Sequence, residues 1–181
     1  PRQPLGDQSA GLDADARRVT TDQDESHSYG RLLLATGGQP RRLPFGGDAV
    51  NYYRTLEDYR ALRADAERGA SFVVIGGGFI GSEVAASLRK QGNEVTLVFP
   101  ETGITDRLFP AELAAFFNDY YRDHGVVVRA GESVTGIEAG ASGATITLGS
   151  GERLAADRVV AGIGIVPNVE LGRAAGLAID N

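Results

Sequence analysis

The clearest pattern of apolar and polar positions runs from residue 72 to residue 101, where the sequence reads FVVIGGGFIGSEVAASLRKQGNEVTLVFPE. Phe72–Ile75 is a continuous apolar run rich in β-branched residues, which predicts a strand buried on both faces. Four apolar residues then share one side of a predicted helix: Ile80, Val84, Ala85 and Leu88. Gly92 follows where a left-handed helix cap is expected. Glu94–Phe99 predicts a second strand, so the segment should fold as strand, glycine-rich turn, helix and strand.

Weaker patterns precede this segment. Pro1–Ala10 is polar and aperiodic and is expected to form a loose end. Leu12–Thr21 predicts a turn and a short strand, and Asp22–Ser28 a hydrophilic turn. Tyr29–Ala35 increases in apolarity and predicts a strand.

Two further amphipathic helices are expected. Thr55–Arg68 predicts a helix that Thr55 and Asp58 cap together. Its expected buried stripe is Leu56, Tyr59, Leu62 and Ala66. Pro110 opens the other helix at the first helical position, and His124 ends it as a cationic cap. The expected apolar face of that helix is Leu113, Phe116, Phe117 and Tyr120.

The remaining pattern completes a fold prediction. Gly125–Arg129 predicts a third parallel strand. Short strands with glycine turns follow at Ser133–Ala139, Ala144–Leu148 and Arg153–Ala155, leading into Asp157–Ala161. Val169–Ala175 predicts a short helix. The expected fold class is α/β, a Rossmann-like three-layer domain with a parallel sheet and a β-meander crossover.

The glycine-rich turn carries the strongest chemical signal. Its GxGxxG spacing between a strand and a helix is typical of a dinucleotide-binding unit. Gly76 would make the tight turn, Gly78 would let the backbone approach a pyrophosphate, and Gly81 would let the helix pack closely. The helix would point its free N–H groups at the phosphates. A plain glycine turn and a site for another nucleotide-like ligand remain the alternatives.

An acid after the second strand refines the expected ligand. A carboxylate there accepts hydrogen bonds from the adenosine ribose and repels a 2′-phosphate. Glu101 is the candidate, although it lies beyond the usual strand-end position, which Phe99 occupies. An ordinary solvated loop acid is the alternative. Arg107 follows and would serve a phosphate or a surface salt bridge, so NADH is expected rather than NADPH.

Composition narrows the function classes. The chain has 181 residues, of which 25 are glycine, and its formal net charge is −6, from 24 acids and 18 bases. No Lys/Arg cluster forms a stripe, so nucleic acid is not expected as a partner. No apolar stretch approaches the roughly 18 residues of a transmembrane segment. The chain begins with Pro1 and has no Met, so we interpret it as a fragment, and a cytoplasmic location is expected.

The chain has no cysteine, so it carries neither a disulfide framework nor a redox-active C-x-x-C pair. Electron chemistry would therefore need a bound cofactor. The close grouping of Asp24, Glu25 and His27 is interpreted as solvated surface, and no metal site is expected.

Four ordered motifs together resemble one protein family. LLLATGGQPRRLP, VVIGGGFIGSEVAASL, VTLVFPE and VVAGIGIVPNVELGRAAGLAID are similar to the FAD-dependent pyridine nucleotide-disulfide oxidoreductases, in particular the apoptosis-inducing-factor and ferredoxin-reductase branch. In that family an inserted NADH domain interrupts an FAD domain. The resemblance therefore implies that residues 1–46 end the first FAD-domain segment, 47–165 form the NAD(P)H-binding domain and 166–181 begin the second FAD-domain segment.

The resemblance also implies roles for individual residues on the NADH side. Phe79 and Ile80 would lie at the pyrophosphate and nicotinamide, with Phe79 near the nicotinamide ring. Glu83 would face the nicotinamide amide, and the alternative is an acid in the first helical turn that complements the dipole. Gly164 would let the backbone approach the nicotinamide.

Two more matches concern the adenosine side, and three concern the flavin. Glu101 matches the family's ribose-binding acid, and Arg107 a basic position near the adenosine. Thr36 and Gly37, with Arg41, would touch FAD. The FAD domain's own glycine fingerprint is missing, so the fragment should hold NADH weakly and FAD hardly at all.

The function implied is that of an FAD-dependent NADH oxidoreductase. Hydride would pass from NADH to flavin, and electrons would pass on to a ferredoxin or a quinone, with no side chain needed as acid or base. A homodimer is also expected. The main alternative is a nucleotide-sensing interaction protein of the apoptosis-inducing-factor type with incidental turnover. A one-domain dehydrogenase is disfavoured because no Tyr-x-x-x-Lys pair follows the fingerprint.

Overall fold

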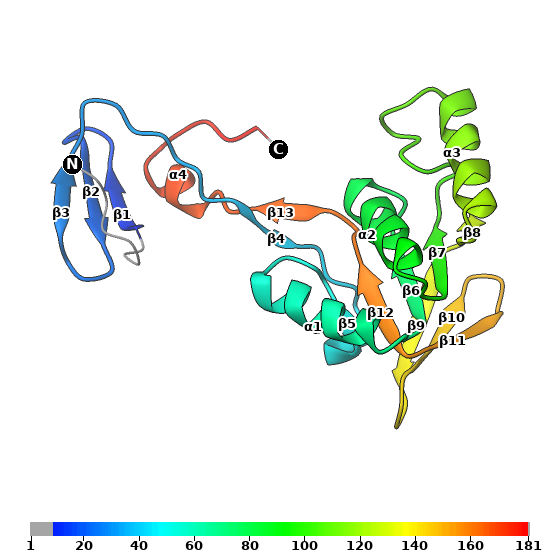
Figure 1. The fold of residues 1–181 in the computed structure, drawn as a ribbon. Helices are drawn as coiled ribbons and strands as arrows, with labels where there is room; N and C mark the ends of the chain where they lie inside the picture. The colour runs from blue at the N-terminus through cyan, green and yellow to red at the C-terminus, as the bar shows by residue number, and fades with distance from the viewer. Residues whose placement is uncertain (1–8, 181) are drawn as a thin grey trace. The chain divides into compact units, whose positions relative to one another are not determined.

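The computed structural model describes residues 9–180, which divide into two compact units. Unit 1 combines residues 9–39 with residues 165–180, and unit 2 contains residues 40–164 (Figure 1). Within the described residues, no helix is both long and apolar enough to cross a bilayer.

Unit 1 is built from short elements. Three antiparallel strands form one sheet: β1 (Ser9–Asp13), β2 (Arg18–Thr21) and β3 (Ser26–Ser28). Where the chain leaves unit 1 and returns to it, β4 (Gly38–Pro40) pairs with β13 (Ile165–Pro167). A short helix, α4 (Glu170–Ala174), follows β13.

Unit 2 is organised around a five-stranded parallel sheet with the order β5-β12-β6-β7-β8. Its strands are β5 (Val50–Asn51), β6 (Phe72–Ile75), β7 (Val95–Phe99), β8 (Val127–Ala130) and β12 (Arg158–Ala161). The helical elements are the 3₁₀ turn η1 (Gly47–Ala49), α1 (Leu56–Glu67), α2 (Phe79–Lys90) and α3 (Ala111–Asp123). An antiparallel meander joins β8 to β12 through β9 (Val134–Ala139), β10 (Ala144–Leu148) and β11 (Arg153–Ala156).

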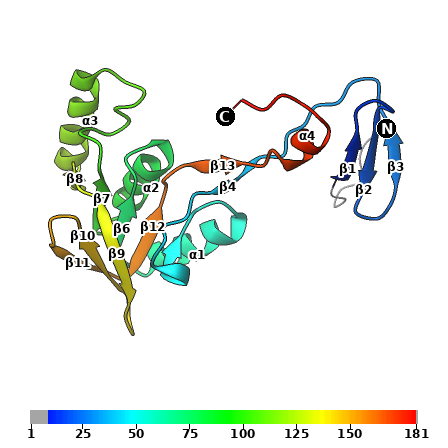
Figure 2. The ribbon, with the colours of Figure 1, turned by 180° about the vertical axis from the view of Figure 1, so that it is seen from behind.

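The sheet separates two hydrophobic cores because neighbouring residues of a strand point to opposite faces. In β6, Phe72 and Val74 pack with residues of α1 and α2, whereas Val73 and Ile75 pack with residues of the meander. Helices thus cover one face and β9–β11 the other (Figure 1 and Figure 2). The predicted Rossmann-like three-layer α/β fold is confirmed.

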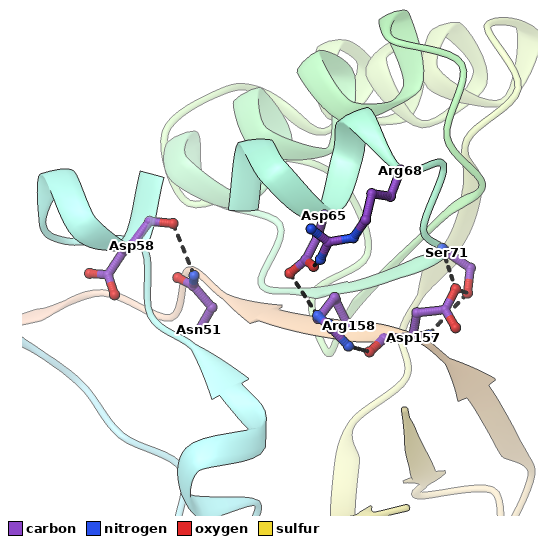
Figure 3. Close-up of polar contacts among 7 residues, drawn as sticks. All are labelled: Asn51, Asp58, Asp65, Arg68, Ser71, Asp157 and Arg158. Atoms are coloured by element: carbon purple, nitrogen blue, oxygen red, sulfur yellow. Dashed lines mark hydrogen bonds and ion pairs between the residues drawn. The ribbon is translucent and has the colours of Figure 1, made fainter. Parts of the chain in front are cut away.

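Polar contacts join the amino-terminal ends of two central strands. Before β6, Ser71 donates from its backbone nitrogen and its hydroxyl to the Asp157 carboxylate, at 2.7 and 2.8 Å. Next to it, Arg158 Nε donates to Asp65 of α1 (2.6 Å). Arg68 also pairs with Asp65, whose side chain is only 13% exposed (Figure 3). These contacts fix the end of α1 against the edge of the sheet opposite to the glycine-rich turn.

A reciprocal cap starts α1, as predicted. The Thr55 hydroxyl accepts from the Asp58 N–H (3.1 Å), and the Asp58 carboxylate accepts from the Thr55 N–H (2.7 Å). Asn51 of β5 donates to the Asp58 carbonyl oxygen (3.2 Å), which ties the cap to the sheet (Figure 3). Burial raises the pKa of Asp58, but the hydrogen bonds from Thr55 and Arg54 outweigh burial and hold that pKa below its ordinary value.

Several predictions of local structure in unit 1 are wrong or only partly right. The expected strand Tyr29–Ala35 is absent, and Leu33 is 86% exposed. A strand needs a partner for its backbone groups, and no strand among residues 9–180 pairs with this segment. The expected turn Asp22–Ser28 ends in strand β3. Of the expected loose end Pro1–Ala10, residues 1–8 lie outside the described residues and the other two belong to β1.

The predicted apolar stripes are only partly right. Val84, Ala85 and Leu88 are buried in α2, and Leu62 and Ala66 in α1, as expected. The other expected stripe residues are exposed: Leu56, Tyr59, Ile80, Leu113, Phe116 and Tyr120. Helix α3 instead turns Ala114 and Asn118 inward, and only the partly buried Phe117 of its expected face packs on the core. Pro110 is the residue before α3 and not its first helical residue.

The Asp58 cap generates a prediction of pH dependence. Because the folded-state pKa of Asp58 is lowered, the ionised carboxylate stabilises the fold above the unfolded-state value of about 3.9. That contribution is lost as pH falls through the folded-state pKa. Asp58→Asn should therefore lower the free energy of unfolding by about 1 kcal/mol at pH 7, and by less near pH 3. Urea denaturation followed by circular dichroism measures both differences.

The control is Glu57→Gln, which removes the neighbouring acid from the same helical turn. Among the described residues, Glu57 forms an exposed 4.0 Å ion pair with Arg60, so its replacement should change stability by less than about 0.5 kcal/mol. An Asp58→Asn effect that stayed constant from pH 7 to pH 3 would show that the carboxylate charge does not stabilise the cap.

Candidate functional site

The glycine-rich turn lies at the carboxyl edge of the parallel sheet, directly after β6. Gly76 ends the strand with a φ of 110°, and its N–H donates to the Val98 carbonyl oxygen of β7 (2.8 Å). A Cβ on Gly81, in the first turn of α2, would overlap the carbonyl oxygen of Gly76. The predicted tight turn and the predicted close helix packing are therefore both present, and both depend on glycine.

Gly78 differs from these two glycines. Its φ of −78° and ψ of −173° are open to any residue, and a Cβ built on it meets no atom within 4 Å. Neither backbone conformation nor packing within the described chain therefore requires glycine at this position. The space beside the Gly78 backbone is open to a group that approaches from outside.

The amino terminus of α2 has no side-chain cap and is suited to bind an anion. Gly78 is its N-cap residue, no side chain caps the first turn, and that turn contains no acid. Helix α1 shows the contrast, because the Thr55 hydroxyl accepts a hydrogen bond from the Asp58 N–H in its first turn. Uncapped N–H groups at the positive end of a helix dipole are a suitable binding site for phosphate oxygens.

The acid expected at the ribose lies at the same edge, after β7. Glu101 is partly buried, with 24% of its side chain exposed, and it forms an ion pair with Arg107 (Nη2 to Oε1, 2.6 Å). The Arg107 side chain is 81% exposed. The structure thus brings together the two residues that the sequence assigned to the adenosine side, and the arginine is the more exposed partner of the pair.

The residues expected near the nicotinamide start α2. Phe79 and Ile80 are 56% and 41% exposed, respectively, and Glu83 is exposed. Ile80 and Glu83 line a groove of about 510 Å³ between α1 and α2, together with Tyr59 of α1. The first turn of α2 contains no acid, so Glu83 lies just beyond the turn where the alternative interpretation placed it.

Gly164 and Arg41 meet where the chain enters and leaves unit 2. The Arg41 N–H donates to the Gly164 carbonyl oxygen (2.9 Å), and Gly164 has a φ of 97°. A Cβ on Gly164 would lie 3.6 Å from the Arg41 side chain. One residue assigned to the nicotinamide and one assigned to FAD are therefore direct neighbours.

Thr36 and Gly37 belong to unit 1, where Asn168 binds both of them. The Thr36 hydroxyl donates to the Asn168 carbonyl oxygen (2.5 Å), and the Asn168 side chain donates back to the Thr36 carbonyl oxygen (2.8 Å). The Asn168 N–H donates to the Gly37 carbonyl oxygen (2.9 Å). Two segments that are far apart in the sequence thus form one hydrogen-bonded pair.

Sequence reasoning missed two further glycines at the carboxyl edge. A Cβ on Gly77 would lie 2.7 Å from the Phe99 ring, and a Cβ on Gly162 would lie 2.8 Å from the Gly81 backbone nitrogen. The signal for both was present, since Gly77 extends the fingerprint and Gly162 follows the strand β12. The Gly77 contact depends on the position of β7, and the Gly162 contact on the pairing of β12 with β6.

It also missed two polar residues that hold the loop after Glu101. The Thr105 N–H donates to the Gly77 carbonyl oxygen (2.8 Å), and the buried Asn118 side chain bonds the same loop from α3. The sequence carries no signal for Asn118, because helical periodicity does not distinguish a buried asparagine from a solvent-exposed one.

Comparison with known proteins gives a consistent result. The family profile described as "Pyridine nucleotide-disulphide oxidoreductase" matches residues 3–181. Putidaredoxin reductase CamA of Pseudomonas putida is 40% identical over 97% of this chain and 44% of its own length. The anthranilate 1,2-dioxygenase system ferredoxin–NAD(+) reductase component of Burkholderia cepacia is 40% identical over 98% of this chain and 44% of its own.

Solved structures agree with the sequence relatives. The covalent putidaredoxin reductase–putidaredoxin complex matches with a TM-score of 0.87 and 38% identity, over 97% of this chain and 44% of that one. The water-forming NADH oxidase from Lactobacillus brevis bound to NADH matches with a TM-score of 0.80 and 28% identity, over 92% and 39%. The chain thus spans less than half the length of these relatives.

The two kinds of glycine generate a stability prediction. Gly81→Ala should lower the free energy of unfolding by about 3 kcal/mol, because its methyl group would force α2 away from β6. Gly78→Ala should lower it by less than about 1 kcal/mol, since the position is open and only the N-cap preference changes. Urea denaturation of both variants gives the comparison. Equal losses would show that close packing at Gly81 does not decide the position of α2.

Proposed function

The chain belongs to the pyridine nucleotide-disulphide oxidoreductase family, and from this we propose that it is the NADH-binding portion of an FAD-dependent oxidoreductase. In the intact protein, hydride would pass from NADH to flavin, and electrons would pass on to a protein or quinone acceptor. The ferredoxin reductases among its relatives support this proposal.

The observation that carries the proposal is the open space at Gly78. Glycine is required at Gly76 and Gly81 by the fold itself, but nothing in the described chain requires it at Gly78. A glycine that folding does not need is explained when a ligand must approach the backbone closely. In a strand–turn–helix unit of this spacing, that ligand is the pyrophosphate of a dinucleotide.

The proposed roles are those that the family resemblance implies for the residues at the carboxyl edge. The free N–H groups of α2 bind the pyrophosphate, and Glu101 accepts hydrogen bonds from the adenosine ribose. Phe79 and Ile80 form an apolar surface that orients the nicotinamide and excludes water, and Glu83 holds the nicotinamide amide. Gly164 admits the ring close to the backbone. These residues bind and align, and none of them acts as an acid or base.

The division into two units is consistent with separate binding of the two cofactors. We propose that unit 2, expected as residues 47–165, binds NADH, and that the flanking segments, expected as residues 1–46 and 166–181, contribute to an FAD-binding domain. Thr36, Gly37 and Arg41 would contact FAD from these borders. FAD, when bound, supplies the flavin that accepts the hydride.

The proposed acceptor is a ferredoxin. Support comes from the relatives, which are named as reductases of ferredoxin-type proteins. A quinone is the other acceptor class expected from the sequence, and a nucleotide-sensing role finds no support in the names of these relatives. A homodimer and a cytoplasmic location stay proposals, which sedimentation analysis and cell fractionation would test.

The central experiment compares NADH binding by the intact protein and its Gly78→Ala variant. The added methyl group should weaken NADH binding at least tenfold, about 1.4 kcal/mol, because it occupies the space proposed for the pyrophosphate. Isothermal titration calorimetry measures the dissociation constant, and circular dichroism checks the fold. Gly30→Ala is the matched control, because a Cβ there also meets no atom within 4 Å and it lies outside the turn. Unchanged affinity in Gly78→Ala would exclude the proposed site.

Glu101 generates a second test, on coenzyme preference. Glu101→Gln removes the charge that attracts the ribose hydroxyls and repels a 2′-phosphate, and it releases Arg107. NADH should bind more weakly and NADPH more tightly, so the preference for NADH should fall by about tenfold or more. Glu132→Gln removes the same charge from a neighbouring loop at this edge and should leave the preference unchanged. An unaltered preference in Glu101→Gln would remove Glu101 from the ribose site.

A further inference from the structure

The loop that follows Glu101 is held rigidly although it has no regular secondary structure. Ile104 is 2% exposed and packs in the helix-side core. A Cβ on Gly103 would lie 2.6 Å from the Ala114 Cβ, so the loop lies directly against α3. The 102–105 loop, as we name these residues, is therefore clamped between the sheet edge and α3.

Asn118 supplies the polar part of this clamp. Its side chain is at the buried face of α3, and the residue is 6% exposed. The Oδ1 atom accepts from the Ile104 N–H (3.1 Å), and Nδ2 donates to the Thr102 carbonyl oxygen (2.8 Å). One amide thus satisfies a donor and an acceptor of the loop at once, which fixes the orientation of the peptide groups between them.

A second contact joins the loop to the glycine-rich turn. The Thr105 N–H donates to the Gly77 carbonyl oxygen (2.8 Å). Thr105 holds a left-handed backbone with a φ of 59°, which is unfavourable for a β-branched residue. Thr105 is buried, with 8% exposure, and a strained backbone of this kind persists only where the surrounding structure holds it. The strained residue therefore sets the distance between the loop and the turn.

These contacts leave Glu101 fixed on both sides. Its carbonyl oxygen accepts from the Gly131 N–H beyond β8 (2.8 Å), and the 102–105 loop continues directly from it. The covalent length of an ADP group sets the separation between its ribose hydroxyls and its pyrophosphate. A carboxylate that binds the ribose must therefore be held at a set position relative to the Gly77–Gly78 backbone.

We propose that Asn118 is a positioning residue for the adenosine half of the dinucleotide. It holds the 102–105 loop against α3, the loop holds the Gly77 carbonyl through Thr105, and Glu101 is thereby kept in register with the phosphate-binding turn. This inference rests on the proposed function of the site. It goes beyond that function because Asn118 itself touches neither ribose nor phosphate.

Replacing a residue that only stabilises the fold should lower stability without changing the affinity for the dinucleotide. Asn93 provides the comparison, because it is 2% exposed and its side chain also donates to a backbone carbonyl oxygen, that of Leu88 (3.2 Å). Asn93 precedes β7, whereas the loop that Asn118 binds follows it, so the two asparagines act at opposite ends of this strand. Both replacements should lower stability, but only a change at Asn118 should affect the adenosine site.

The experiment uses calorimetric binding of NADH, NADPH and ADP-ribose to the intact protein and three variants. Asn118→Ala should weaken NADH and ADP-ribose by the same factor, about tenfold, and should reduce the preference for NADH over NADPH. Asn118→Asp keeps one acceptor and loses the donor to Thr102, so its effect should have the same direction. Asn93→Ala should leave all three affinities within about twofold of the wild type.

The outcomes separate this inference from the proposed function. Wild-type protein that bound neither NADH nor ADP-ribose would overturn the proposed site itself. Wild-type binding that depends on Glu101, with affinities equally affected by Asn93→Ala and Asn118→Ala, would overturn only the positioning role. If Asn118→Ala does not fold, unchanged ADP-ribose affinity in Asn118→Asp would also refute it. A loss confined to the Asn118 variants and shared by NADH and ADP-ribose would confirm it.

Discussion

The approach of one helix to one strand without intervening side chains determines the rest of unit 2. At the end of β6 the carbonyl oxygen of Gly76 lies where a Cβ of Gly81 would be, and Gly162 of the neighbouring strand packs against the same helical turn. Three backbones meet because none of the three residues has a side chain. The contact sets the start of α2, and with it the direction in which the uncapped N–H groups point.

Two hydrophobic cores and a group of polar contacts stabilise the rest of unit 2, away from the glycine contact. Two separate cores hold the helices and the meander to opposite faces of the sheet. At the amino-terminal edge, the paired charges of Asp65 and Arg158 and the mutual bonds of Ser71 and Asp157 secure the strand starts. Charged side-chain pairs therefore hold the strand starts at one edge, whereas the carboxyl edge is held by close glycine packing and by the contacts of the 102–105 loop, and it leaves open the space beside Gly78.

Much of this organisation was predictable because it depends on local rules. Continuous apolar runs identified β6 and β7, the Thr55–Asp58 spacing identified the cap of α1, and the fingerprint identified the turn. Prediction failed where distant contacts decided the outcome. Helix α3 exposes Phe116 and buries Asn118, since the peptide groups of a loop need a polar partner more than the core needs another ring. Periodicity counts apolar residues and cannot detect such a need.

The same reason explains the errors outside the central unit. Residues 29–35 have the composition of a strand, but composition does not supply a neighbouring strand with which to pair. In the candidate site, the residues read from the sequence were those whose chemistry is local, such as a glycine in a turn. The contacts of Thr105 and Asn118 depend on how loop and helix pack, which no short motif encodes.

The point where the chain enters and leaves unit 2 has an evolutionary consequence. Arg41 and Gly164 are joined by a backbone hydrogen bond, and β4 pairs with β13 beside them. Because the two ends of this unit adjoin, it can be inserted into a loop of another protein without stretching that loop. Recombination can therefore move the unit as one piece between host proteins without disturbing the fold of the host.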